Sequence, residues 1–215
     1  MKHYTTILFD LDGTLTDPGL GITNSVAHAL ARLGRAVPPR EQLYRYIGPP
    51  LIHSFREYAG LTEAEARQAV TLYREYFAPT GIFENAVYEG IPALLRDLRA
   101  AGKDVVLATS KPEQFAVQIL EHFELAQFFT AVAGASMDET RTAKGDVIAL
   151  ALQRCGAGPD TALMVGDREH DVLGAAANGL RCVGVGYGYG SREELLNAGA
   201  SAYAETVAQL REILL

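Results

Sequence analysis

Residues 5–14 read Thr-Thr-Ile-Leu-Phe-Asp-Leu-Asp-Gly-Thr, an apolar run that stops at two aspartates. The apolar run predicts a buried strand, and Gly13 lets the chain turn sharply after it. Asp10 and Asp12 are two residues apart, so their carboxylates can project the same way from an extended chain end. Two adjacent anions repel each other unless a cation or a proton lies between them. An Asp-Gly pair alone indicates only a turn, but after a buried strand this stretch predicts a metal site, an acid–base site or both.

The composition is that of a globular protein, with 215 residues and a net charge of −7. This length allows one large domain, or one domain with an insertion. Long basic runs are absent, which argues against a nucleic-acid polymer as the main partner but not against a small anionic substrate. The two cysteines, Cys155 and Cys182, lack metal-ligand spacing. The first residues are too short and polar for a signal peptide, and no apolar run reaches membrane length, so we expect a cytoplasmic protein.

The predicted secondary-structure pattern changes along the chain. Between about Gly19 and Phe83 we find helix signals and no convincing strand, including a capping box at Thr62-x-x-Glu65. From Lys103 onward, short apolar runs alternate with helical segments, which predicts an α/β fold with a doubly wound parallel sheet. The helical block follows the first strand directly. We therefore expect a core made of residues 1–16 and 87–215, with a helical insertion at residues 17–86.

Polar residues follow several of the predicted core strands. Strands are predicted at residues 104–108, 129–133, 162–165 and 181–185. Because the carboxyl ends of parallel strands meet at one edge of a sheet, the polar residues there should converge. These residues are Asp10, Asp12, Thr109, Ser110, Lys144, Asp167 and Asp171. A capping box predicted at Ser110-x-x-Glu113 would leave backbone N–H groups to receive a phosphate.

Two features of this set indicate anion and metal binding. Lys144 stands in the first turn of a predicted helix, where the helix dipole disfavours a cation. It therefore suggests an anionic partner, with a solvated surface lysine as the alternative. Asp167 and Asp171 are four residues apart and share a face of a helical turn. Oxygen ligands without His or Cys partners favour Mg²⁺ over zinc.

With these motifs the sequence closely resembles the haloacid dehalogenase superfamily of phosphotransferases, over its whole length. The family's four motifs match Asp10 to Thr14 (Asp-x-Asp-Gly-Thr), Thr109 (a strand end), Lys144 (a helix start) and residues 166–171 (Gly-Asp-x-x-x-Asp). The resemblance implies a Rossmann-like core of residues 1–16 and 87–215. It also implies that residues 17–86 are a small α-helical cap domain.

The resemblance implies a role for each motif residue. Asp10 would be the nucleophile that forms an aspartyl-phosphate, and Asp12 would be the general acid and base. The implied Mg²⁺ ligands are Asp10, the backbone carbonyl of Asp12, Asp167 and, through water, Asp171. The residues expected to bind the phosphoryl group or the substrate are Thr109, Ser110, Lys144, Gly13, Arg45 and Gly48. For the two cap positions, Arg45 and Gly48, a packed or solvated cap surface is the alternative.

Some segments narrow the choice within the family. Dehalogenases of the superfamily lack the second aspartate, so Asp12 argues against that chemistry. Residues 47–51, 166–171 and 184–192 look most like the phosphoglycolate phosphatase-like subgroup, and within it like bacterial 5′-nucleotidases. We expect a Mg²⁺-dependent phosphatase that acts on a nucleoside monophosphate, with phosphoglycolate as the alternative. A sugar-phosphate mutase and a non-catalytic regulatory protein are further alternatives, and the expected assembly is a monomer or homodimer without a membrane partner.

One further motif, Gly186-Tyr187-Gly188-Tyr189-Gly190, invites comparison with phosphate-binding loops. It follows a late strand and lacks the spacing of dinucleotide-binding loops. We therefore expect a flexible or structural loop there.

Overall fold

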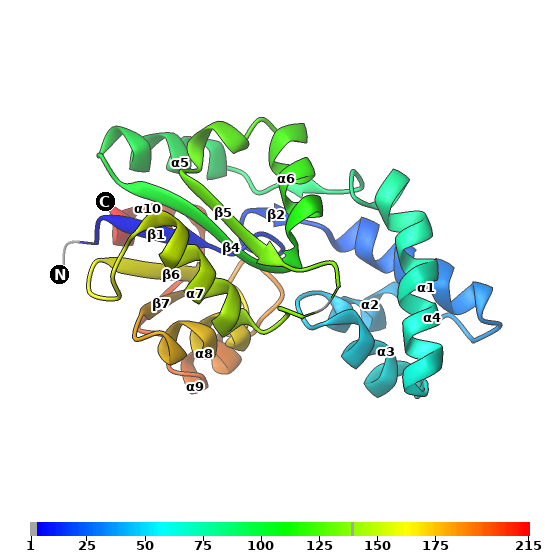
Figure 1. Cartoon of the computed structure of the whole chain (residues 1–215). Helices are drawn as coiled ribbons and strands as arrows, with labels where there is room; N and C mark the ends of the chain where they lie inside the picture. Colours follow the sequence, from blue (N-terminus) through cyan, green and yellow to red (C-terminus); the bar gives the residue numbers. More distant parts are fainter. Residues whose placement is uncertain (1–3, 139) are drawn as a thin grey trace. The chain divides into compact units, whose positions relative to one another are not determined.

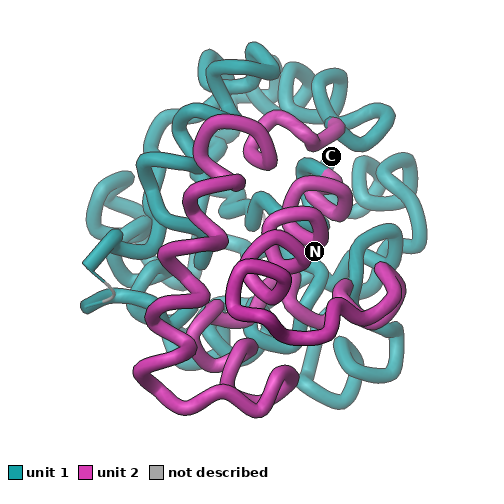
Figure 2. The backbone as a smooth tube through the Cα atoms, turned by 90° about the vertical axis from the view of Figure 1, so that its right-hand side faces the viewer, with its two compact units in different colours: residues 1–16, 87–215 teal, residues 17–86 magenta. Residues whose placement is uncertain are grey.

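The computed structural model describes residues 4–138 and 140–215. Contacts between Cα atoms divide the chain into two compact units, Met1–Thr16 with Val87–Leu215, and Asp17–Ala86 (Figure 2). Two short strands stand where the chain passes between the units, β2 (Thr16–Asp17) and β3 (Ala86–Val87). Among the helices of the described residues, none combines the length and the apolar character that crossing a membrane requires.

The larger unit is built on a six-stranded sheet in the order β5-β4-β1-β6-β7-β8. Its strands are β1 (Thr6–Phe9), β4 (Asp104–Pro112), β5 (Ala131–Ala135), β6 (Ala162–Gly166), β7 (Arg181–Val185) and β8 (Ala202–Ala204). Every neighbouring pair is parallel, and in the centre Phe9 is in register with Leu107 on one side and Val165 on the other. The predicted doubly wound parallel sheet is confirmed, and the carboxyl ends of β1, β4 and β6 lie at one edge.

Helices cover both faces of this sheet. Figure 1 shows α5 and α6 on one side of the sheet and α7, α8 and α9 on the other, and α10 packs against α5. Their bounds are α5 (Ile91–Ala100), α6 (Glu113–His122), α7 (Lys144–Cys155), α8 (Glu169–Ala177), α9 (Arg192–Asn197) and α10 (Val207–Leu214), with a 3₁₀ turn at Ala126–Phe128. Ser191 and Thr206 cap α9 and α10 by accepting backbone N–H bonds from Glu194 and Gln209.

The central strand is buried on both faces, as its uninterrupted apolar sequence requires. All four residues of β1 are buried. Leu8 packs in one core cluster with Val106 and Met164 of the flanking strands and with Val147 and Val172 of α7 and α8. Residues that alternate with Leu8 point to the opposite face, towards the other helix layer. A strand held this firmly fixes the position of the aspartates that follow it.

The smaller unit is helical. It contains α1 (Gly19–Arg32), α2 (Arg40–Leu43), α3 (Leu51–Ala59) and α4 (Glu63–Tyr76), with a 3₁₀ turn at Tyr44–Tyr46 and a π-helical turn at Phe77–Gly81. The predicted capping box at Thr62 is confirmed, with the Thr62 hydroxyl and the Glu65 carboxylate each accepting the other's backbone N–H. Gly60 ends α3 in the left-handed conformation, at φ +64°. No strand lies between residues 19 and 83, as the sequence predicts.

The capping box predicted at Ser110 is wrong. Strand β4 continues to Pro112, so Ser110 lies within the strand, and α6 begins at Glu113 without a side-chain cap. The Glu113 carboxylate instead accepts the backbone N–H of Gly134 and pairs with Arg154. The pairing register between β4 and β5 shifts between Thr109 and Pro112. Through this irregularity β4 extends beyond its apolar residues.

Candidate active site

The first site element is the turn that follows β1. The Asp10 N–H donates to the Val165 carbonyl, which continues the sheet ladder to the first aspartate. Gly13 then adopts φ +84°, a conformation that L side chains rarely adopt. A Cβ atom at Gly13 would lie 2.6 Å from the Asp167 carboxyl carbon. The turn after β1 therefore lies directly against the aspartate that follows β6, and only a glycine leaves room for that approach.

Three buried aspartates meet at this edge of the sheet. Asp10, Asp167 and Asp171 each offer a carboxylate oxygen, and these oxygens all lie within 4.8 Å of one another. We call these three residues the acidic triad. Asp167 follows β6 directly, while Asp171 stands in the first turn of α8 and accepts the Arg168 N–H.

Lys144 lies among the carboxylates of the triad. It is the first residue of α7, and its Nζ lies 2.6 Å from Asp10 Oδ1 and 2.7 Å from Asp171 Oδ1. Burial lowers the pKa of Lys144, but the two carboxylates raise it by more, so the net pKa is above its ordinary value. The anionic partners suggested by this lysine's place in the first turn are therefore Asp10 and Asp171.

The triad carries more negative charge than its surroundings neutralise. Burial, followed by the charges of Asp171 and Asp10, raises the pKa of Asp167 well above its ordinary value. Burial also raises the pKa of Asp171 to about 6, although Lys144 partly offsets it. Buried carboxylates whose pKa values are raised in this way favour a nearby cation.

Asp12 has its own lysine partner. Lys111 Nζ lies 2.6 Å from Asp12 Oδ2, and both side chains are almost fully buried. Burial raises the pKa of Asp12, and Lys111 opposes that rise. The other oxygen, Asp12 Oδ1, is buried with no hydrogen-bond partner among the described residues. No sequence motif marks Lys111 as a site residue, although it stands two residues after Thr109 on the same strand.

The remaining predicted residues are distributed over both units. Thr109 is buried at the site edge of β4, and its hydroxyl accepts the Lys111 N–H at 3.2 Å. Ser110 is half-buried in the same strand. Arg45 and Gly48 belong to the helical unit, where the Arg45 guanidinium stacks on the Tyr58 ring at 4.5 Å. Gly48 adopts φ +102° there.

A divalent cation fits the charges of this site. Four aspartates, Asp10, Asp12, Asp167 and Asp171, face two lysines, Lys111 and Lys144, which leaves two negative charges when all six ionise. The triad supplies only carboxylate oxygens, the hard donors that Mg²⁺ and similar ions prefer. The triad is therefore a group that could hold a metal ion.

The comparisons with known proteins agree with this geometry. A family model described as haloacid dehalogenase-like hydrolase matches residues 7–185. The chain therefore belongs to the haloacid dehalogenase-like hydrolase family. A solved structure described as a predicted phosphatase from Clostridium acetobutylicum is 47% identical, with a TM-score of 0.96 over 99% of this chain and 98% of that chain.

Curated relatives indicate the enzyme class of the chain within this family. A Pseudomonas aeruginosa protein named 5′-nucleotidase is 48% identical over 99% of this chain and 96% of its own length. A Mycobacterium tuberculosis protein named Tyrosine-protein kinase PtkA is 43% identical over 97% of this chain and 72% of its own length. Phosphoglycolate phosphatase 1 of Pseudomonas aeruginosa is 34% identical over 85% and 70%. Within its family the chain is thus a phosphatase, a phosphoric monoester hydrolase.

Proposed function

We propose that this protein is a Mg²⁺-dependent 5′-nucleotidase that works through a phosphorylated Asp10. The observation that carries the proposal is the meeting of Asp10, Asp167 and Asp171 within 4.8 Å at one sheet edge, with Lys144 bonded to two of them. An anionic nucleophile can approach an anionic phosphate ester only where cations offset the repulsion between them. This site holds lysines and a place for a divalent cation beside the proposed nucleophile.

The proposed reaction has two steps. In the first, a carboxylate oxygen of Asp10 attacks the phosphorus, the bond to the ester oxygen breaks, and Asp12 gives its proton to the departing alkoxide. In the second, Asp12 takes a proton from water, the hydroxide attacks the phosphorus, and the bond to Asp10 breaks to release inorganic phosphate. Asp12 is thereby reprotonated and ready for the next cycle. An almost fully buried carboxyl whose pKa is raised suits both roles.

The other residues at the sheet edge are proposed to bind the cation and the phosphoryl group, and they transfer no proton. Mg²⁺ would be held by Asp10, Asp167, Asp171 and the Asp12 carbonyl, and it would neutralise charge on the phosphoryl oxygens. We propose that Lys144, Thr109, Ser110 and the Gly13 backbone bind the phosphoryl oxygens. Lys111 keeps Asp12 in place through their 2.6 Å ion pair.

A nucleoside monophosphate is the proposed substrate. The support is the relative named 5′-nucleotidase, whose similarity extends over 99% of this chain. Phosphoglycolate is the second candidate, supported by the 34% identical phosphoglycolate phosphatase. We further propose that the helical unit, residues 17–86, is a cap that selects the substrate, with Arg45 and Gly48 as the candidate residues.

A phosphate-release screen tests the proposal. The purified protein is given nucleoside monophosphates, phosphoglycolate and hexose phosphates, with Mg²⁺ or with EDTA, and Asp10→Asn is the matched control. We expect release from at least one nucleoside monophosphate that exceeds release from phosphoglycolate and disappears with EDTA or with Asp10→Asn. Release that survives either treatment contradicts the mechanism. Hexose phosphate that isomerises faster than phosphate appears identifies a mutase, and turnover of no ester in the screen favours a regulatory protein.

The relative named a tyrosine-protein kinase supports one more arm of the screen. If a tyrosine hydroxyl rather than water accepts the phosphoryl group, then incubation with ATP labels tyrosine in the protein. Labelling that depends on Asp10 and outpaces phosphate release would replace hydrolysis as the proposed function.

A further inference from the structure

The connection between β7 and α9, residues 186–191, lies against both aspartate-bearing turns of the site. A Cβ atom at Gly188 would lie 2.5 Å from Asp167 Oδ2 and would overlap the Gly13 carbonyl oxygen. A Cβ atom at Gly190 would overlap the Asp167 carbonyl oxygen. Gly188 and Gly190 are thus required by close approach to Gly13 and Asp167, whereas Gly186 lies against the Tyr203 hydroxyl.

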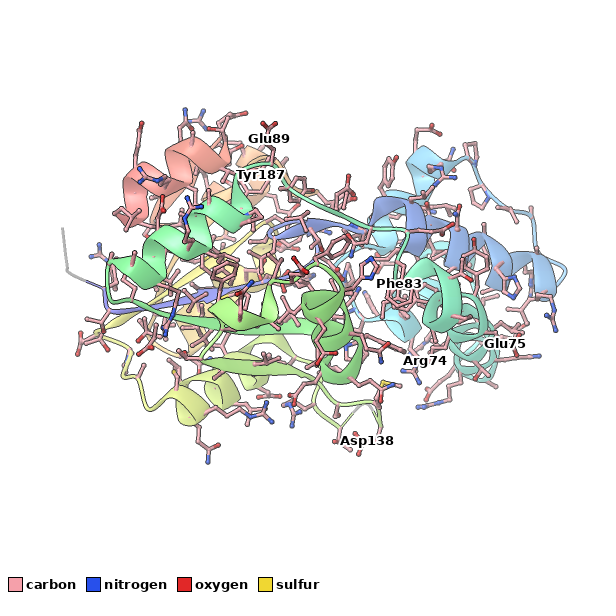
Figure 3. All side chains as sticks on the ribbon, turned by 90° about the horizontal axis from the view of Figure 1, so that it is seen from above. Arg74, Glu75, Phe83, Glu89, Asp138 and Tyr187 are labelled. Atoms are coloured by element: carbon pink, nitrogen blue, oxygen red, sulfur yellow. The ribbon has the colours of Figure 1, made fainter. Side chains whose placement is uncertain are left out.

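The two tyrosines of this connection bond to the same turns. The Tyr189 N–H donates to Asp167 Oδ2 at 2.8 Å. The hydroxyl of Tyr187, the residue labelled in Figure 3, donates to the Thr14 carbonyl at 3.1 Å. The Tyr187 ring stands edge-on to Tyr88. The backbone N–H that a phosphate-binding loop would offer at Tyr189 is therefore directed at a carboxylate of the triad.

The first turn of α9 holds the two residues that follow Asp167. Glu194 Oε1 accepts from Arg168 Nε at 2.8 Å and from the Glu169 N–H at 2.9 Å. Glu194 is itself held by the Ser191 hydroxyl, which accepts its N–H at 3.0 Å. The residues on either side of the α8 start are thus tied to the same segment that contacts the turn after β1.

We infer that residues 186–194 are a positioning clamp for the cation site, joining the turn after β1 to the turn after β6. The inference rests on the proposed function, because it takes the acidic triad to bind a divalent cation. Asp167 Oδ2 is bonded to Tyr189, and Asp167 Oδ1 lies 3.4 Å from the Thr14 hydroxyl. These bonds fix the direction of the lone pairs that remain for a cation. Partners of this kind typically change metal affinity about 10–100-fold when removed.

Gly188→Ala tests the clamp through metal binding rather than activity. Mg²⁺ affinity of the metal-free protein is measured by calorimetry, beside Gly158→Ala, where an added Cβ meets nothing within 4 Å. We expect the Kd to rise about 10–100-fold for Gly188→Ala and to stay unchanged for Gly158→Ala. In the release assay, the Mg²⁺ concentration for half-activation should rise for Gly188→Ala and stay unchanged for Gly158→Ala.

Tyr187→Phe provides a second variant in case Gly188→Ala does not fold. It removes one hydroxyl, and we expect a smaller rise of the Mg²⁺ Kd, about threefold to tenfold. An unchanged Kd in a folded Gly188→Ala, or in Tyr187→Phe where Gly188→Ala does not fold, overturns the clamp and leaves the proposed function standing. If the wild-type protein binds no Mg²⁺, the cation site of the proposed function fails and the clamp fails with it.

Discussion

Replacing Lys111 by Met should destabilise the protein in a way that depends on Asp12 and on pH. The ion pair between them is short, 2.6 Å, and the side chains are only 5% and 12% exposed. Methionine keeps much of the volume but removes the charge. Asp12 would then be a buried carboxylate without its cation, with one oxygen, Oδ1, already unpartnered among the described residues.

The size of the effect follows from this geometry. At 2.6 Å and an effective dielectric constant of about 20, the pair attraction is ~6 kcal/mol before desolvation is subtracted. Removing one partner of a buried pair typically costs about 3–5 kcal/mol. For a chain of this length, a loss of about 3 kcal/mol lowers Tm by about 6–12 °C. Protonation of Asp12 relieves the buried charge, so the loss should shrink as the pH falls.

The sign of the pH effect can be checked directly. Burial already raises the folded-state pKa of Asp12 above its unfolded value, and loss of Lys111 raises it further. A carboxyl with a raised pKa contributes stability at low pH that is lost as the pH rises through the folded-state pKa. The Lys111→Met protein should therefore be closest to wild type near pH 5 and furthest from it near pH 8.

Urea unfolding in EDTA at pH 5 and pH 8 measures these differences without any contribution from a bound cation. Asp12→Asn and the double variant complete a double-mutant cycle. In the Asp12→Asn background, Lys111→Met should lose less than half of what it loses alone, since no charge is left unpaired. A loss under about 1 kcal/mol at pH 8, or the same loss in both backgrounds, refutes the reasoning.

Three further outcomes follow from the site. Asp10→Asn should lower phosphate release at least ~10³-fold while the protein stays folded by circular dichroism, because it removes the nucleophile; partial activity would point to another nucleophile. Because burial raises the pKa of Asp167 and Asp171, their contribution to metal-free stability is lost as pH rises, so Mg²⁺ should raise Tm more at pH 8 than at pH 5; an equal shift at both pH values would exclude these carboxyls as the ligands. Gly13→Ala should weaken Mg²⁺ binding at least about tenfold, as its Cβ would displace the Asp167 carboxylate, and unaltered calorimetric binding would contradict this geometry.

The fold could be predicted because its main signal is repeated along the chain. Alternating apolar runs and helical segments from Lys103 onward permit few arrangements other than a parallel sheet. The predicted aspartates and Lys144 come together because β1 and β6 end at the same sheet edge as β5, the strand that precedes α7. Helix α5 and strand β8 are among the elements that received no prediction. Helix α5 does carry helical spacing, with Ile91, Leu94, Leu95 and Leu98 buried, whereas the three residues of β8 are too few to show a period.

The wrong cap at Ser110 and the unpredicted role of Lys111 have a common physical cause. The sequence predicts a helix cap at Ser110 because a helix does follow, but a register shift extends β4 to Pro112. That same extension places Lys111 where its Nζ reaches Asp12, a contact between residues 99 apart in sequence. Helix and strand propensities and motif spacing carry information only about residues that are close together along the chain. A strand irregularity is decided by pairing with another strand, so neither Ser110 nor Lys111 could be placed from sequence alone.

Lys144 connects the proposed cation site to the proposed phosphoryl-binding site. Lys144 pairs with Asp10 and Asp171 in the metal-free protein and offsets part of their charge, so the proposed nucleophile is held by a hydrogen bond before any substrate arrives. A cation bound to the triad would take over part of that neutralisation. The Lys144 ammonium, fixed at the start of α7, would then have a positive charge to share with an incoming phosphoryl group. The surplus of carboxylates over lysines at the metal-free site favours binding of a cation, and the bound cation would in turn offset the repulsion of an anionic phosphate ester.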